Sequence, residues 1–273
     1  MAVVRNVAVV SESKSVKVAD LVAPVAAMQI QITRDFAPVW RRPATIAVFD
    51  KLTSVPVDHW PVIVRDDIPY QAQGIHLDRD GSPFALVLYS PDWSLTTSHE
   101  VLEMLGDPLG TRTKTAPSIK AGQGQVKYLV EVCDPSEASD FAYEINGSTM
   151  SDFYLPSFFD AEKVDGRQYS FTNSIKSPRS ILKGGYISWQ VPSTREWWQQ
   201  TWFGTKKFRS LGVLGRGTNP RRGTDGQTDV PASFMQGAPS TARAVAAANG
   251  TAPKERADFL RAEVRRIVAA ATP

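Results

Sequence analysis

The order of apolar patterns between residues 24 and 108 limits what this chain can fold into more than any other feature of the sequence. Pro24 can open a helix whose apolar residues recur at three- and four-residue steps up to Phe36, with prolines after it that would end it. β-branched and aromatic runs of strand length follow at 44–50 and 61–66. A helix with one apolar face followed by strands predicts a helix packed on a sheet.

Residues 74–90 predict a β-hairpin, because two short strand-like runs flank Asp80-Gly81, a pair typical of tight turns. Residues 94–108 predict a short helix, with hydroxyl residues suited to its N-cap and Gly106 suited to its end. Further strand-like runs lie at 126–134, 167–173 and 185–191, whereas 114–125 has the composition of a loop. Strands and helices in this order predict the α+β class.

The single cysteine, Cys133, excludes an intrachain disulfide and a cysteine-rich zinc module. The start of the chain lacks an apolar run behind basic residues, and no stretch reaches the roughly 18 apolar residues that a membrane helix needs. We therefore expect no signal peptide, no transmembrane segment and no membrane partner.

Charge is divided unevenly along the chain. Residues 205–273 carry twelve Lys or Arg against five Asp or Glu, while the first 204 residues carry nineteen against twenty-three. A basic tail can dock on a protein partner or contact nucleic acid through counterion release. The predicted organisation is a polar lead-in at 1–22, a main domain at 23–204, a flexible basic linker at 205–252 and a basic helix at 253–273.

The motif His-Glu-Val-Leu-Glu at 99–103 points to chemistry because it lies on the predicted helix 94–108. Residues i and i+4 of a helix lie about 40° apart around its axis, so His99 and Glu103 can reach one metal ion. In the related H-E-x-x-H motif two histidines bind zinc, and the glutamate accepts a proton from the attacking water. By this pattern His99 and Glu103 are candidate ligands of Zn²⁺, and Glu100 is the candidate general base.

A catalytic zinc needs a further protein ligand. We rank Glu131 first, Asp134 second and Asp107 third. Alternation along a strand would put Glu131 and Asp134 on opposite faces, so that both bind only if the strand breaks there. His76, in the predicted hairpin, is expected beside the ligands and at most in contact with them. The simpler interpretation is an exposed helix with a solvated polar face, with the two downstream acids as turn caps.

These residues stand in an order that resembles the zincin-like metallopeptidases, and more closely a group of bacterial and phage proteins with a modified H-E-x-x-E helix. The shared segments are RDFAPVW (34–40), GIHLDRDGSPFALVLYS (74–90), SHEVLEMLGDP (98–108), EVCDP (131–135) and SDFYLPSFF (151–159). The resemblance covers roughly residues 24–200, so that 23–204 is expected to be a zincin-like metal-binding or catalytic domain. Because phage proteins are among those that the chain resembles, the expected location is cytoplasmic or virion-associated.

The resemblance implies a mixed, twisted sheet whose edge strand lies beside the active helix. Residues 84–90 correspond to that edge strand, which would pair with an extended peptide substrate. The resemblance also assigns metal binding to His99 and Glu103 and proton transfer to Glu100. It favours a site role for Glu131 or Asp134 without deciding between them.

Tyr154, in the last shared segment, is a conceivable donor to the oxyanion of the reaction through its phenol, or else a packed aromatic residue. Three hypotheses therefore stand. The first is a zinc-dependent peptidase acting on a peptide or protein substrate. The second is a non-catalytic protein on a zincin scaffold, for example a component of a phage particle or secretion assembly, which docks through its basic tail. The third is a nucleic-acid-associated protein, supported only by the charge of the tail.

Overall fold

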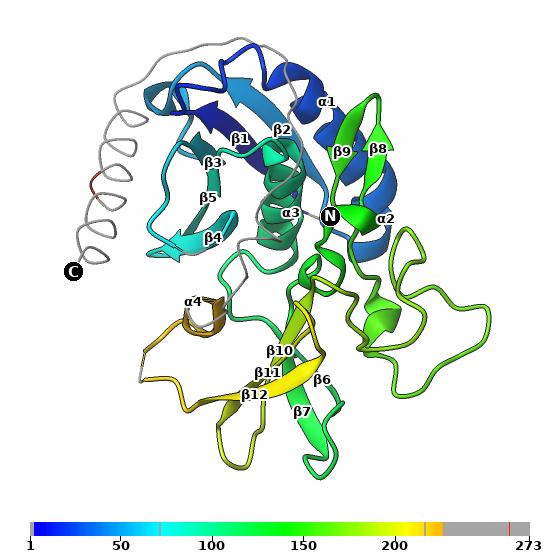
Figure 1. The fold of residues 1–273 in the computed structure, drawn as a ribbon. Helices are drawn as coiled ribbons and strands as arrows, with labels where there is room; N and C mark the ends of the chain where they lie inside the picture. Colours follow the sequence, from blue (N-terminus) through cyan, green and yellow to red (C-terminus); the bar gives the residue numbers. More distant parts are fainter. Residues whose placement is uncertain (1–2, 71, 216, 226–261, 263–273) are drawn as a thin grey trace.

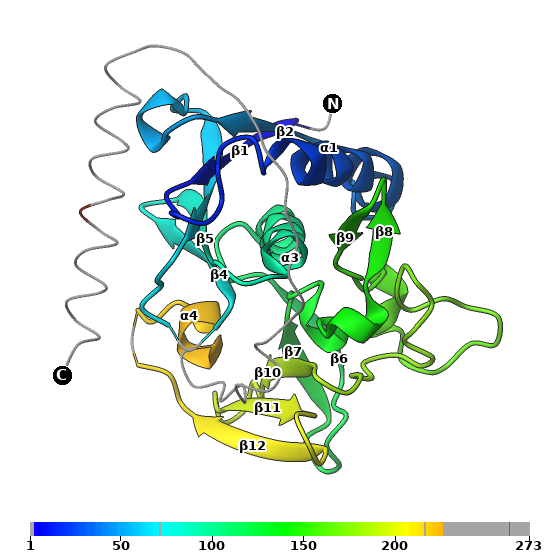
Figure 2. The same cartoon turned by 45° about the horizontal axis from the view of Figure 1, so that its top comes forward.

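The computed structural model describes residues 3–70, 72–215 and 217–225, together with residue 262. It contains two five-stranded sheets and a two-stranded ribbon, with the helix α3 (Trp93–Gly106) between the two larger sheets (Figures 1 and 2). This mixed architecture confirms the predicted α+β class. No described helix is both long enough and apolar enough to cross a membrane.

The first sheet has the strand order β2-β1-β3-β5-β4, in which β4 alone runs antiparallel to its neighbour. Its strands are β1 (Arg5–Ser11), β2 (Ala44–Phe49), β3 (His59–Arg65), β4 (Gly74–Arg79) and β5 (Ser82–Leu88). The predicted hairpin is β4–β5, and both turn residues have positive φ, 51° at Asp80 and 79° at Gly81, as a tight hairpin turn requires. The edge strand is β4. The expectation that 84–90 forms the edge was wrong, because the hairpin folds β4 onto the free side of β5.

The predicted N-terminal helix is present and longer than expected. α1 (Val22–Ile30) continues through the π-helical segment η1 (Gln31–Phe36) into α2 (Ala37–Trp40). Pro38 does not end it, because it lies in the first turn of α2, where a residue without an N–H is tolerated.

Alternation along β1 explains how the first sheet is covered. Val7 and Val9 pack with the helices α1 and α3, whereas Ala8 and Val10 pack on the opposite face with residues from the connection between β2 and β3. All four are fully buried, and burying one Val side chain stabilises a fold by about 1.5–3 kcal/mol. Residues 5–11, which the sequence pattern placed in a lead-in, are therefore a central strand.

The second sheet is antiparallel throughout and has the order β12-β11-β10-β7-β6. Its strands are β6 (Thr113–Pro117), β7 (Gln125–Leu129), β10 (Tyr186–Gln190), β11 (Trp197–Thr201) and β12 (Lys207–Gly212), and the ribbon is β8 (Tyr143–Ile145) with β9 (Ser148–Met150). Short 3-10 turns are η2 (Leu52–Ser54), η3 (Asp134–Ser136), η4 (Ser139–Phe141) and η5 (Pro156–Phe159).

Several expectations for the later chain were wrong. Residues 114–125 are not wholly a loop, because β6 pairs with β7 there. Residues 167–173 form no named strand and contribute one isolated bridge, between Ser170 and Tyr154. Within the predicted linker 205–252, β12 and the helix α4 (Pro220–Asp225) are ordered secondary structure. The predicted helix 253–273 lies outside the described residues apart from residue 262.

Gly185, just before β10, allows a close backbone approach that holds the segment carrying Asp134. A Cβ at this position would lie 2.6 Å from the carbonyl oxygen of Asp134 and 2.7 Å from that of Pro135. We expect Gly185→Ala to lower the free energy of unfolding by about 1–3 kcal/mol, because backbone atoms must move. Urea denaturation measures this, with Gly204→Ala as the control, since a Cβ on Gly204 meets nothing within 4 Å. Equal effects of the two changes would contradict the packing argument.

Candidate metal centre

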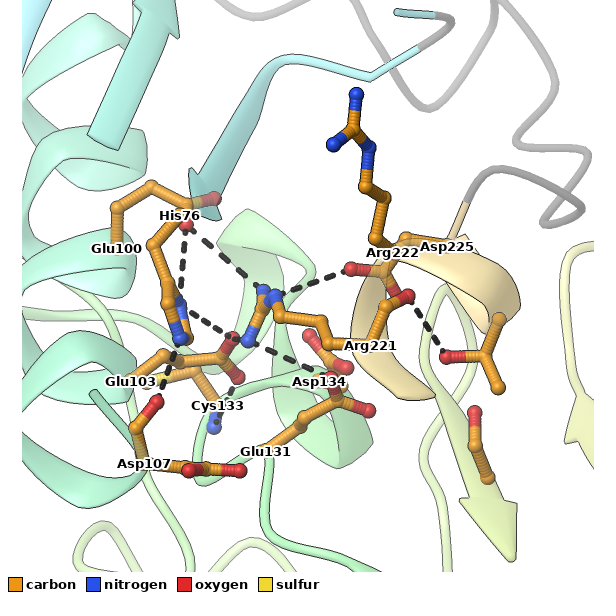
Figure 3. A network of polar contacts seen from close by, with 12 residues as sticks. His76, Glu100, Glu103, Asp107, Glu131, Cys133, Asp134, Arg221, Arg222 and Asp225 are labelled. Carbon is orange, nitrogen blue, oxygen red and sulfur yellow. Dashed lines mark hydrogen bonds and ion pairs between the residues drawn. The ribbon is translucent and has the colours of Figure 1, made fainter. Parts of the chain in front are cut away.

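The helix α3 places His99, Glu100 and Glu103 in the interior of the molecule, so the solvated-face interpretation was wrong. All three side chains are at least 89% buried. The helix packs closely under β4 because the strand begins with Gly74, where a Cβ would lie 2.5 Å from Oε1 of Glu100 and 2.7 Å from Cγ2 of Thr96. The turn of α3 that carries the motif is therefore held against β4, and Figure 3 shows Glu100 and Glu103 near His76, Asp134 and Arg221.

His99, Glu103 and Asp134 converge from α3 and the segment after β7. Nε2 of His99 lies 3.6 Å from Oε1 of Glu103 and 3.2 Å from Oδ1 of Asp134. The potential ligand atoms of the three residues all lie within 4.8 Å of one another. The backbone N–H of Cys133 donates to Oε1 of Glu103 at 3.1 Å, which holds this carboxylate and the segment before Asp134 in register.

Glu131, ranked first as the further ligand, belongs to a different group of carboxylates. Its neighbours are Asp134 and Asp225, again with potential ligand atoms within 4.8 Å of one another. β7 ends at Leu129, so strand alternation does not apply beyond it and Glu131 and Asp134 both reach the cluster. The structure brings Asp134, the second choice, into the group with His99.

His76 lies closer to the cluster than expected, whereas the Asp107 side chain is turned away from it. Nε2 of His76 is 2.8 Å from the carbonyl oxygen of Asp107 and must donate, which leaves the lone pair of Nδ1 facing the acids. Nδ1 lies 3.8 Å from Oε2 of Glu100 and 4.0 Å from Oε2 of Glu103. These three residues form another group with metal-ligand spacing. The Asp107 carboxylate instead accepts from the backbone N–H of Arg112 at 2.6 Å.

Arg221 and Asp225, on α4, are site residues that the sequence pattern missed. The Arg221 guanidinium contacts Oε2 of Glu103 through Nη1, which also lies 3.4 Å from Oε1 of Glu131, while Nε is 3.0 Å from Oδ2 of Asp225. A local signal for α4 does exist. Asn219 precedes Pro220, and its Oδ1 accepts from the N–H of residue 222 at 3.2 Å, which is an N-cap followed by proline at the first helical position.

Six carboxyl groups gather around these contacts, from Glu100, Glu103, Glu131, Asp134, Glu137 and Asp225. Burial raises the pKa of Glu100 to about 8 and that of Asp225 to about 7, and it raises the pKa of Glu131 well above its usual value. Glu103 is the exception: although burial opposes ionisation, Arg221 and His99 hold its pKa well below the usual value. The metal-free cluster therefore retains protons at neutral pH, because its cations are too few.

Tyr154 is almost completely buried and lies close enough to the same acids for their charge to affect its phenol. Its ring stacks on Phe158 at a centroid distance of 4.2 Å, and its backbone carbonyl accepts from Nε1 of Trp40. Burial, followed by the charge of Glu103, raises the pKa of its phenol well above the usual value. Tyr154 is thus a packed aromatic residue with a protonated phenol, and its oxyanion role stays a prediction.

A divalent cation fits the donor set of His99, Glu103 and Asp134. One imidazole nitrogen and two carboxylates are acceptable zinc ligands, and Oδ2 of Asp134 is buried with no hydrogen-bond partner among the described residues. A dication would also compensate the excess of buried acid. Comparison of the chain with protein-family models, with curated proteins and with solved structures finds no match in any of the three.

The raised carboxyl pKa values predict how the stability of the metal-free protein depends on pH. Glu100 titrates at about 4.5 when unfolded and at about 8 when folded, so the folded state holds a proton that the unfolded chain releases in that window. Burial opposes the protonation of His99, but Glu103 and Asp134 raise its pKa well above the usual value. His99 therefore also makes stability fall with rising pH above pH 6.5. We expect the free energy of unfolding in EDTA to fall by at least about 2 kcal/mol from pH 6.5 to 8.5, which is the contribution of Glu100 alone.

Urea denaturation at a series of pH values measures this slope. Burial lowers the pKa of His76, which makes stability rise with pH, but only below the usual pKa of 6.5. His76 therefore does not affect the slope between pH 6.5 and 8.5. Glu100→Gln should reduce the slope, because a carboxamide does not titrate, and the part that His99 contributes should remain. Stability that is constant or rises between pH 6.5 and 8.5 would show that the cluster is not protonated in the metal-free chain.

Proposed function

We propose that this chain is a zinc-dependent hydrolase of peptide bonds with a zincin-like arrangement, in which His99, Glu103 and Asp134 bind the ion. One observation carries the proposal. Three buried potential ligand atoms, two from successive turns of α3 and one from the segment after β7, all lie within 4.8 Å of one another. Asp134 supplies the acid that the two-residue helix motif lacks.

Bound zinc would supply a Lewis acid that polarises the carbonyl of the scissile peptide. Glu100, next to His99 on α3, accepts a proton from the attacking water at its carboxylate and donates it to the leaving amine. General acid–base catalysis is most effective when the pKa of the catalytic group lies near the operating pH, and the pKa of Glu100 is about 8. The positive charge of a bound zinc ion would lower this pKa. Neutral His76 faces Glu100 with the lone pair of Nδ1, which can accept a hydrogen bond from this carboxyl group only while the group carries the proton.

β4 supports a peptide as the substrate. It is the terminal strand of the first sheet in the described residues, so its outer backbone groups have no strand partner there. An extended peptide can add to such an edge through main-chain hydrogen bonds. His76, whose side chain faces Glu100, belongs to this strand, so a peptide paired along β4 would pass the proposed general base.

A second candidate is a non-catalytic scaffold or binding protein, for example a particle or secretion-assembly component. The observation that favours it is Arg221, because a guanidinium among the carboxylates gives the cluster a structural cation of its own. On this alternative the motif residues would stabilise the fold and would not perform chemistry.

Metal content tests the proposed ligand set. We expect protein purified without added metal to hold close to one zinc per chain by elemental analysis, and His99→Ala and Asp134→Asn each to lower zinc affinity at least about tenfold. Glu131→Gln should lower it less, since Glu131 lies in a different group from His99. His59→Ala, on β3, is the matched control. A larger loss with Glu131→Gln than with Asp134→Asn would exchange their assigned roles.

Glu100→Gln tests catalysis separately from binding. The carboxamide keeps the shape of the side chain but cannot accept the proton, so cleavage of casein or a peptide library should fall at least about a hundredfold, with zinc content unchanged. Glu144→Gln, an exposed change of the same kind on β8, should leave cleavage unaltered. If the wild-type chain binds zinc but cleaves none of these substrates, the non-catalytic alternative is favoured.

A further inference from the structure

The guanidinium of Arg221 puts a cation of the chain itself inside the candidate metal centre. Besides its contact with Oε2 of Glu103, its Nη2 lies 3.8 Å from Oε2 of Glu100, the proposed base. Only 4% of the Arg221 side chain is exposed. An arginine buried to this extent requires acidic partners, so the carboxylates fix its position (Figure 3).

Backbone contacts attach this part of the chain to the turn after α3. We call residues 219–225 the docking segment. The N–H of Arg221 donates to the carbonyl of Gly110 at 3.2 Å, and Nδ2 of Asn219 donates to the carbonyl of Leu109 at 2.6 Å. The segment is thus held to the turn after α3 by one main-chain donor and one side-chain donor, and to the cluster by the Arg221 side chain.

The docking segment also reaches the strand on which a substrate would lie. Nδ2 of Asn219 is 3.5 Å from Oδ1 of Asp78, on the edge strand β4. The helix α4 lies beside the end of this strand in both views of the fold (Figures 1 and 2). The segment therefore contacts both elements that the proposed function uses, the edge strand and the acidic cluster.

We propose that the docking segment is an internal inhibitor of the metal centre, so that docking of Arg221 and binding of a divalent cation oppose each other. This inference rests on the proposed function. Arg221 and the cation would share one carboxylate, since Arg221 contacts Oε2 of Glu103 while Oε1 lies 3.6 Å from Nε2 of His99. A guanidinium and a dication within a few ångströms repel each other, and thermodynamic linkage makes the opposition reciprocal.

Arg221→Gln and Arg222→Gln form a matched pair that tests the opposition. Both remove one positive charge from α4, but Arg222 is exposed and points away from the cluster (Figure 3). Zinc affinity of the full chain is measured by competition with a fluorescent chelator. We expect Arg221→Gln to bind Zn²⁺ at least about tenfold more tightly than wild type, and Arg222→Gln to stay within about twofold.

Equal affinity in wild type and both variants would overturn the inference and leave the metal centre standing. Weaker binding by Arg221→Gln would also overturn it, because Arg221 would then support the ligands. If His99→Ala changes zinc affinity in neither the wild-type nor the Arg221→Gln background, the metal centre itself fails. The two proposals can therefore fail separately.

Hydrogen exchange of the wild-type chain supplies a measurement that does not depend on a variant folding. In the metal-free chain the Arg221 amide is protected by the Gly110 carbonyl. Saturating Zn²⁺ should increase the exchange rate of peptides that cover residues 219–225 at least about threefold, because the segment is released. Exchange that is unchanged or slower with zinc would contradict release of the segment.

Discussion

Burying two glutamates on successive turns of α3 is the constraint on which the rest of the site depends. An ionised carboxylate away from water is stable only when it is paired, hydrogen-bonded or bound to a metal. Each neighbour of Glu103 meets part of this requirement. His99 and Arg221 supply positive charge, and the N–H of Cys133 supplies a hydrogen bond. Two distant parts of the chain, the segment after β7 and α4, are thus brought to one carboxyl group of α3.

The same requirement explains why elements distant in sequence meet at this helix. The segment after β7 contributes a backbone donor and α4 contributes a guanidinium, whereas the acids of the segment after β7 add to the negative charge that must be compensated. The acids exceed the cations, so burial leaves several carboxyl groups protonated in the metal-free chain. A bound dication would replace these protons, which couples metal affinity to pH.

The sequence patterns correctly predicted the elements that are determined by residues close together in the chain. The Asp80-Gly81 hairpin and the helix that ends at Gly106 follow from turn residues and apolar spacing, and both are present. β1 was missed although four of its seven residues are consecutive and buried, because its position at the start of the chain suggested a polar lead-in. The central place of a strand in a sheet depends on distant pairing, which no local pattern records.

The ranking of Glu131 above Asp134 shows a physical limit of prediction from the sequence. Alternation predicts which way a residue points only while the strand continues, and β7 ends at Leu129. Beyond that residue the direction of Asp134 depends on tertiary contacts, namely the Cys133 N–H on Glu103 and the close approach at Gly185. Local patterns could not predict the burial of Arg221, because only the charge of the assembled cluster makes this burial favourable. The chemistry of this site therefore depends on several segments that meet only in the folded chain. A single helix fixes only the placement of His99 beside Glu103.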